Sequence, residues 1–198
     1  MATVLFVYAH PDDESFGIAG TAMKLKDEGH ITGLLTLTRG DVGMWFGRET
    51  GSWTPEELAR ERSKEWREAT KVIGFEQCRL LEWPDGGLRD APIERVTADV
   101  VQLIRELRPD VVCTFGPEGA GSEHDDHRAA SLFALRGFHR AGLADQYPDR
   151  GQAHQAKRLF FNASPFVADF PIIAMTPTHF HLAVDRSGTI GSAGDLFH

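Results

Sequence analysis

The chain has 198 residues, of which 41% are hydrophobic and 25% charged, and its formal net charge is −8 at pH 7. This composition is typical of a globular protein, and the length suits one domain over residues 1–198. The acidic balance argues against a nucleic-acid partner, which would require a basic face, and the sequence has no run of about 18 apolar residues that could insert into a membrane.

Cysteine placement and the first residues of the chain bear on the cellular compartment. Cys78 and Cys113 both lie in apolar, strand-like runs, which predicts buried free thiols rather than a disulfide. The first residues carry no basic leader and already have the pattern of a strand. Together these observations predict a cytoplasmic protein.

Strand-like and helix-like segments alternate along the chain. Residues 3–9 form a short apolar run rich in β-branched and aromatic residues, typical of a strand buried on both faces. Thr54, Pro55 and Glu57 form a capping box with proline at the first helical position, so we expect a helix to start there and to end at Gly74. The predicted strands lie at 3–9, 31–37, 79–81, 110–115, 157–164 and 178–184, and the predicted helices at 15–28, 55–73, 93–107 and 126–139.

This alternation predicts an α/β fold with a mostly parallel sheet and helices on both faces. In such sheets, ligands bind outside the carboxyl ends of the strands. Three unusually polar segments directly follow predicted strands: AHPDDE at 9–14, TRGD at 38–41 and GPEGAGSEHDDH at 116–127. We therefore expect segments far apart in the sequence to meet at one edge of the sheet.

The first and third of these segments are crowded with carboxylates and imidazoles. A divalent cation would offset the mutual repulsion of the carboxylates, and two imidazoles with one carboxylate form a recurrent catalytic zinc set. His127 falls at a predicted helix start, where the helix dipole favours the neutral ring that a metal requires. Singly, Asp12 is typical of a helix cap and His124 of a surface loop. Together, the two clusters predict a metal site.

Two other interpretations of these features are weaker. Gly17 and Gly20 after the first strand lack the three-glycine spacing of a dinucleotide-binding turn, and the neighbouring carboxylates would repel a pyrophosphate. His179 and His181 form a second possible metal pair on one face of a strand, but no carboxylate lies close by in the sequence. We expect a structural role for that pair.

AHPDDE followed by HDDH resembles the PIG-L/LmbE family of zinc-dependent N-acetylglucosamine deacetylases. The resemblance extends to TRGD, to RSKEWREATKVIG at 62–74 and to LEWPDGGL at 81–88. It implies a Rossmann-like three-layer α/β/α fold and a homo-oligomer, either a trimer or a hexamer. The implied reaction is removal of an acetyl group from an N-acetylglucosamine-containing glycoside, for example a bacillithiol- or mycothiol-type precursor.

The resemblance also implies roles for individual residues. The zinc ligands would be His10, Asp13 and His127, a set that would also suit iron(II). Asp12 matches the general base of the family. His124, backed by Asp126, matches its second catalytic group.

Substrate contacts are implied for Arg39 and Asp85. A third is expected from Trp45, because aromatic residues in the segment 41–53 are suited to stacking on a sugar ring. The alternative for those aromatic residues is that they fill the core or a subunit contact.

The chain departs from the family pattern at two places. Asp125 stands where the family commonly has proline, and the sequence ends at His198, where relatives usually continue with a helix carrying a further histidine. We therefore expect a shortened C-terminal segment. The rival hypothesis is a metal-bearing Rossmann-like binding protein without hydrolytic activity. The presence of Asp12 and His124, which need not ligate a metal, argues against it.

Overall fold

A computed structural model describes residues 1–43, 53–120, 124–162, 172–175 and 180–183, the last two ranges as backbone only. Its strands form one sheet in the order β3-β2-β1-β4-β5-β6-β7. The strands are β1 (Thr3–Tyr8), β2 (Ile31–Thr38), β3 (Gln77–Trp83), β4 (Val111–Phe115), β5 (Arg158–Asn162), β6 (Ile172–Met175) and β7 (Phe180–Ala183). The helices are η1 (Glu14–Ile18), α1 (Ala19–Asp27), α2 (Pro55–Ile73), η2 (Leu88–Asp90), α3 (Ile93–Leu107), α4 (Asp125–Arg140) and η4 (Pro148–Arg150).

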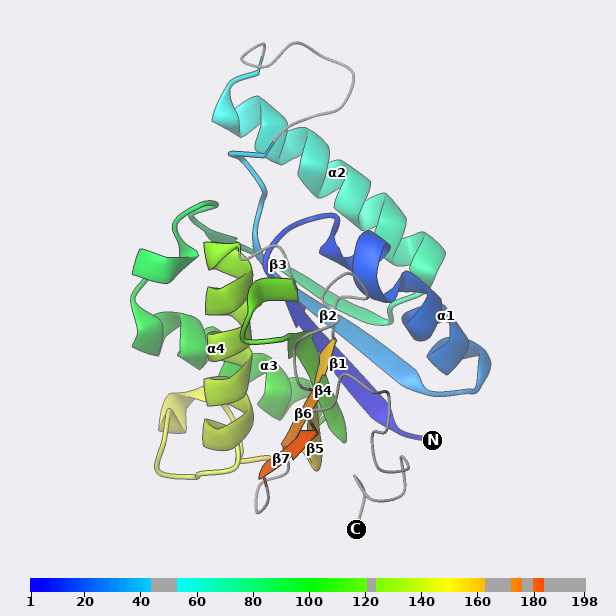
Figure 1. Cartoon of the computed structure of the whole chain (residues 1–198), viewed down its shortest axis with the longest axis vertical. Coiled ribbons are helices and arrows are strands. Elements are labelled where there is room, and N and C mark those ends of the chain that lie inside the picture. Colours follow the sequence, from blue (N-terminus) through cyan, green and yellow to red (C-terminus); the bar gives the residue numbers. More distant parts are fainter. Residues whose placement is uncertain (44–52, 121–123, 163–171, 176–179, 184–198) are drawn as a thin grey trace.

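The first five strands of the sheet are mutually parallel, and β6 and β7 are added antiparallel at one edge. Helices α1 and α2 lie on one face of the sheet, and α3 and α4 lie on the other (Figure 1). The predicted α/β fold with a mostly parallel sheet is therefore confirmed. Strand β6 was not predicted, because it has only four residues and lies between Pro171 and Pro177.

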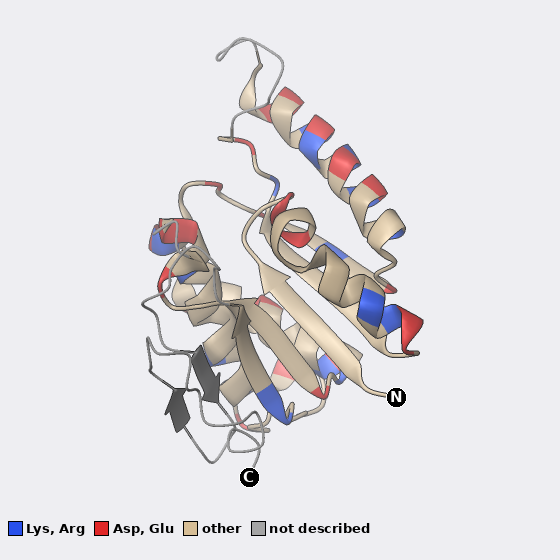
Figure 2. Cartoon of the chain, turned by 45° about the vertical axis from the view of Figure 1, so that its right-hand side comes forward, with Lys and Arg blue, Asp and Glu red and all other residues tan. Residues whose placement is uncertain are grey.

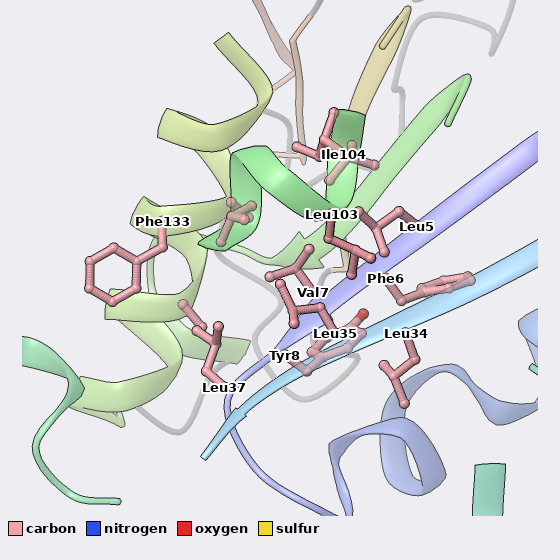
Figure 3. Close-up of a cluster of buried hydrophobic side chains, with 14 of the residues drawn as sticks. Leu5, Phe6, Val7, Tyr8, Leu34, Leu35, Leu37, Leu103, Ile104 and Phe133 are labelled. Carbon is pink, nitrogen blue, oxygen red and sulfur yellow. The ribbon is translucent and has the colours of Figure 1, made fainter. Parts of the chain in front are cut away.

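The central strands are buried on both faces, as their apolar runs predict. Leu5, Val7 and Leu35 have no exposed surface, and Leu103 of α3 lies beside the same strands (Figure 3). Buried residues of α4 belong to the same core cluster. Each fully buried side chain of this size stabilises the fold by roughly 1.5–3 kcal/mol. The carboxyl ends of β1, β2 and β4 are thus held in place by a close-packed core.

Helix α2 begins and ends as the sequence predicts. The Thr54 side chain accepts a hydrogen bond from the backbone of Glu57, the Glu57 side chain returns one, and Gly74 ends the helix in a left-handed conformation with φ 90°. Charged residues are concentrated on the helices, and α2 carries both signs along its length (Figure 2). Its buried face includes Arg62 and Trp66.

Both cysteines are free thiols, as predicted, but they are not both buried. Cys78 is exposed because β3 forms the open edge of the sheet, whereas Cys113 on β4 is partly covered. Among the described residues, no helix has the length and apolar character needed to cross a membrane.

Candidate metal and catalytic site

Three residues from two distant segments converge at the carboxyl ends of β1 and β4. His10 and Asp13 follow β1, and His127 lies in the first turn of α4. One ligand atom from each residue can be chosen so that all three atoms lie within 4.8 Å of one another. The predicted meeting of these residues at one edge of the sheet is therefore seen in the structure.

His10 is oriented by two buried carboxylates. Its Nε2 lies 3.2 Å from Asp126 Oδ2 and 3.1 Å from Asp85 Oδ1, while Nδ1 lies 3.8 Å from Asp13 Oδ2. Although burial lowers the pKa of His10, the hydrogen bonds to Asp126 and Asp85 raise it to about 10. A cation beside Asp13 would displace the Nδ1 proton, and the carboxylates that accept the Nε2 proton would hold the ring with Nδ1 towards that cation.

The Asp13 carboxylate is held by backbone groups. Its Oδ2 accepts hydrogen bonds from the N–H of Ala9 (3.1 Å) and of His10 (2.8 Å), and its Oδ1 lies 3.4 Å from His127 Nε2. Burial raises the pKa of Asp13 to about 7. An ionised carboxylate at this depth is costly unless a positive charge lies beside it.

The His127 ring is fixed by stacking and by one hydrogen bond. It stacks on Phe115 with the ring centroids 4.0 Å apart, and its Nδ1 lies 3.3 Å from the carbonyl oxygen of Gly119. Burial, followed by the neighbouring His10 and His124, lowers the pKa of His127 to about 4. Burial thus favours the neutral ring that was expected at the helix start.

These three side chains fit a zinc or iron(II) ion. They offer two imidazole nitrogens and one carboxylate, and the remaining polar atoms of His10, Asp13 and His127 already have partners that orient them. A second group of His10, Asp85 and Asp126 is also close enough to hold a cation. It fits less well, because it has one imidazole and because backbone N–H groups already occupy its carboxylates.

Asp126 orients His10 rather than His124. This fully buried side chain accepts hydrogen bonds from the N–H of Gly86 (2.7 Å) and of Leu88 (3.0 Å), in addition to contacting His10. Only the backbone N–H of Asp126 reaches His124, at Nδ1 (3.2 Å). The expectation that the Asp126 carboxylate backs His124 is thus wrong: the side chain points into the η2 turn.

His124 itself lies beside the site as the N-cap of α4. Its ring centroid is 5.0 Å from that of His10 and 4.8 Å from that of His127. Because Nδ1 accepts the Asp126 N–H, the proton of the neutral ring belongs on Nε2, which is then free to act as a donor.

Asp12 is paired with an arginine that the sequence analysis did not single out. Arg62 Nη2 lies 2.8 Å from Asp12 Oδ2 and also donates to the carbonyl oxygen of Pro11, while Nη1 donates to that of Gly40 (2.9 Å). Burial raises the pKa of Asp12, and Arg62 and His10 oppose that shift. The sequence did contain a signal for Arg62: it is a charged residue four positions before Trp66 and therefore falls on the apolar face of the predicted helix.

The three residues expected to contact substrate differ in their placement. Arg39 Nη2 lies 3.0 Å from Glu56 on α2, and its Nη1 lies 3.8 Å from Glu82 on β3. Its guanidinium is therefore paired with two carboxylates. Asp85 lies within the site, but its carboxylate contacts His10 and accepts the N–H of Val42. Trp45 lies outside the described residues.

The chain belongs to the PIG-L family. The sequence model of that family, described as GlcNAc-PI de-N-acetylase, matches residues 5–137. This confirms the family expected from the AHPDDE and HDDH segments, both of which lie inside the matched range.

Individual relatives within this family are deacetylases by name. The chain is 35% identical over 149 residues to the 1D-myo-inositol 2-acetamido-2-deoxy-alpha-D-glucopyranoside deacetylase of Kineococcus radiotolerans, covering 63% of this chain and 41% of the relative. It is 33% identical over 141 residues to the diacetylchitobiose deacetylase of Thermococcus kodakarensis, covering 71% of this chain and 50% of the relative. The chain thus spans about half the length of these curated relatives.

A solved structure has the same fold. The N,N'-diacetylchitobiose deacetylase from Pyrococcus horikoshii superposes with a TM-score of 0.72 at 24% identity, covering 83% of this chain and 61% of that one. At this identity the likeness shows the α/β architecture alone.

Proposed function

We propose that this protein is a metal-dependent N-deacetylase that removes the acetyl group from an N-acetylglucosamine-containing glycoside. The observation that carries the proposal is the grouping of His10, Asp13 and His127 beside Asp12, a carboxylate that is half exposed and held by Arg62. The names of the relatives support an N-acetylated amino sugar as the substrate class. Zn²⁺ is the proposed metal, with Fe²⁺ as the alternative that this ligand set also suits.

Each residue of the site has a role in amide hydrolysis. A metal held by His10, Asp13 and His127 would supply Lewis acidity, activating water and polarising the acetyl carbonyl. Asp12, whose outer surface reaches solvent, would accept a proton from the attacking water. His124 would donate a hydrogen bond from Nε2 to the carbonyl oxygen as negative charge develops there, a contribution of about 3 kcal/mol for such a donor.

Location, assembly and substrate contacts belong to the same proposal. We infer a cytoplasmic location from the free cysteines, and a homo-oligomer, a trimer or hexamer, from the family resemblance. Arg39, Asp85 and Trp45 remain the proposed substrate contacts, and the buried Arg62 holds Asp12.

Acetate release from a panel of substrates tests the proposal. The panel comprises N-acetylglucosaminyl inositol, N-acetylglucosaminyl malate and diacetylchitobiose, each assayed with Zn²⁺, with Fe²⁺ and with a chelator. We expect metal-dependent release from at least one member, and a loss of about 10²-fold or more in Asp12→Asn with the metal content retained. His127→Ala should lose bound metal.

Asp125→Asn is the matched control, because Asp125 is an exposed carboxylate of the second motif and contacts Arg89 and Arg128 instead of the metal group. It should behave like the wild type. Full activity of Asp12→Asn, or activity that survives removal of the metal, would refute the mechanism. Tight metal binding with no release from any substrate would favour the binding-protein alternative.

A further inference from the structure

Asp12 adopts a backbone conformation that residues other than glycine rarely occupy. Its φ is 115°, in the left-handed half of backbone space, where the side chain of an L-residue meets its own backbone. Strained residues of this kind persist only where their surroundings hold them, and they cluster at functional sites. The question is therefore which groups hold Asp12 in place.

The peptide unit that joins Pro11 to Asp12 is held at both of its polar ends. The carbonyl oxygen of Pro11 accepts a hydrogen bond from Arg62, and the N–H of Asp12 donates to Glu14 Oε2 at 3.0 Å. On the far side of the residue, the carbonyl oxygen of Asp12 accepts from the N–H of Ser15 (2.8 Å) and of Phe16 (3.0 Å). The orientation of the Pro11–Asp12 peptide thus depends on one guanidinium and one carboxylate.

Glu14, which accepts the Asp12 N–H, is unusual because it is a deeply buried acidic residue. It is 1% exposed, and among the described residues no lysine, arginine or histidine forms an ion pair with it. Its carboxylate accepts hydrogen bonds from the N–H of Asp12, from the hydroxyl of Ser15 (2.9 Å) and from its own backbone N–H. A buried carboxylate without a cation is costly, so its place here calls for a compensating role.

We propose that Glu14 is a positioning residue that holds the Pro11–Asp12 peptide in its strained orientation and so directs the Asp12 carboxylate towards the reacting water. The Asp12 side chain leaves the backbone at the strained residue, so rotation of this peptide would swing the carboxylate. Arg62 holds that carboxylate from one side only, through a single contact of 2.8 Å. Without Glu14, the Pro11–Asp12 peptide can relax to an ordinary conformation, which would turn the Asp12 carboxylate away from the reacting water.

The proposal rests on the proposed function, since turnover is one of its readouts. The test variants are Glu14→Ala, which removes the acceptor, and Glu14→Gln, whose amide oxygen can still accept the Asp12 N–H. In Glu14→Gln the Ser15 hydroxyl can reverse its role and accept from the new amide group. Ser15→Ala is the matched control, because it removes another partner of the Glu14 carboxylate and leaves the Asp12 hydrogen bond intact.

Two measurements are made on each variant. In Glu14→Ala we expect kcat to fall at least tenfold, with KM changed by less than twofold and the bound metal retained. Glu14→Gln should recover most of that loss, and Ser15→Ala should match the wild type. Amide hydrogen exchange at Asp12, followed by NMR in the metal-free protein, should be at least tenfold faster in Glu14→Ala than in Glu14→Gln or the wild type.

The outcomes separate the two proposals. An Asp12 amide that stays protected in Glu14→Ala would overturn the inference, as would fast exchange with an unchanged kcat. An equal fall of kcat in Glu14→Gln and Glu14→Ala would also overturn it. If Glu14→Ala does not fold, Glu14→Asp replaces it, because the shortened side chain withdraws the acceptor. If the wild type releases no acetate, the proposed function fails, and the exchange measurement still decides whether Glu14 holds this peptide.

Discussion

Replacing Asp126 by asparagine removes one acceptor at the point where the η2 turn, α4 and His10 meet. In the wild type, Oδ2 accepts from the N–H of Gly86 (2.7 Å) and lies 3.2 Å from His10 Nε2, while Oδ1 accepts from the N–H of Leu88 (3.0 Å). In Asp126→Asn the best rotamer keeps the oxygen facing Gly86 and His10 and places the amide NH₂ against the single donor of Leu88. The Leu88 N–H and the new NH₂ then lack acceptors, and His10 and Gly86 exchange a charged acceptor for a neutral one.

The cost can be estimated from these contacts. A buried donor without an acceptor costs about 1–3 kcal/mol, and a hydrogen bond to a charged group contributes about 1.5–3 kcal/mol. We therefore expect the free energy of unfolding of the metal-free protein to fall by about 3 kcal/mol. At roughly 2–4 °C per kcal/mol for a chain of this size, Tm should fall by about 6–12 °C.

The same substitution should weaken metal binding through His10. A neutral amide oxygen accepts the Nε2 proton less strongly than a carboxylate does, so it holds less firmly the tautomer whose Nδ1 is left for a metal. Asp85 still accepts from Nε2, so the loss is partial, and we expect metal affinity to fall by about 10–100-fold. Competition with a chromophoric chelator measures this change.

Asp125→Asn is the matched control for the stability measurement as well. Its side chain is 53% exposed and pairs with Arg89 and Arg128 at the surface, so its loss should cost less than about 1 kcal/mol. Thermal unfolding of both variants, monitored by circular dichroism without metal, gives the comparison. Equal Tm values for Asp126→Asn and Asp125→Asn would refute the view that the buried carboxylate ties these elements together.

Two further predictions concern parts of the fold away from the site. Arg105 is 4% exposed, and its guanidinium donates to six backbone carbonyl oxygens between residues 140 and 151. In urea titrations, Arg105→Lys should therefore lower the free energy of unfolding by about 2–4 kcal/mol. The control Arg89→Lys, at an exposed position, should leave the free energy of unfolding unchanged. Burial raises the pKa of Cys113 to about 12, so alkylation of this thiol by iodoacetamide should be slow at pH 7 and should accelerate as the pH rises towards 10. Rapid labelling of Cys113 at pH 7 would contradict this.

Much of the architecture follows from local patterns in the sequence. The strand at 3–9 and the helix that begins at Thr54 were predictable because apolar periodicity and capping depend on neighbours a few residues apart. The rule that strands of a parallel sheet end at one edge then placed His10, Asp13 and His127 near one another. The exposure of Cys78 was not predictable, because an edge strand and a central strand can have equally apolar sequences.

The sequence by itself determined which residue types are present at the site and at which edge of the sheet they gather, since both depend on chain order and local periodicity. Only the tertiary structure decided their pairing. Asp126 contacts His10 across 116 positions of sequence and Arg62 reaches Asp12 across 50. Such partners are selected by the packing of α2 and α4 against opposite faces of the sheet, and no spacing within either segment encodes the direction in which a side chain will point.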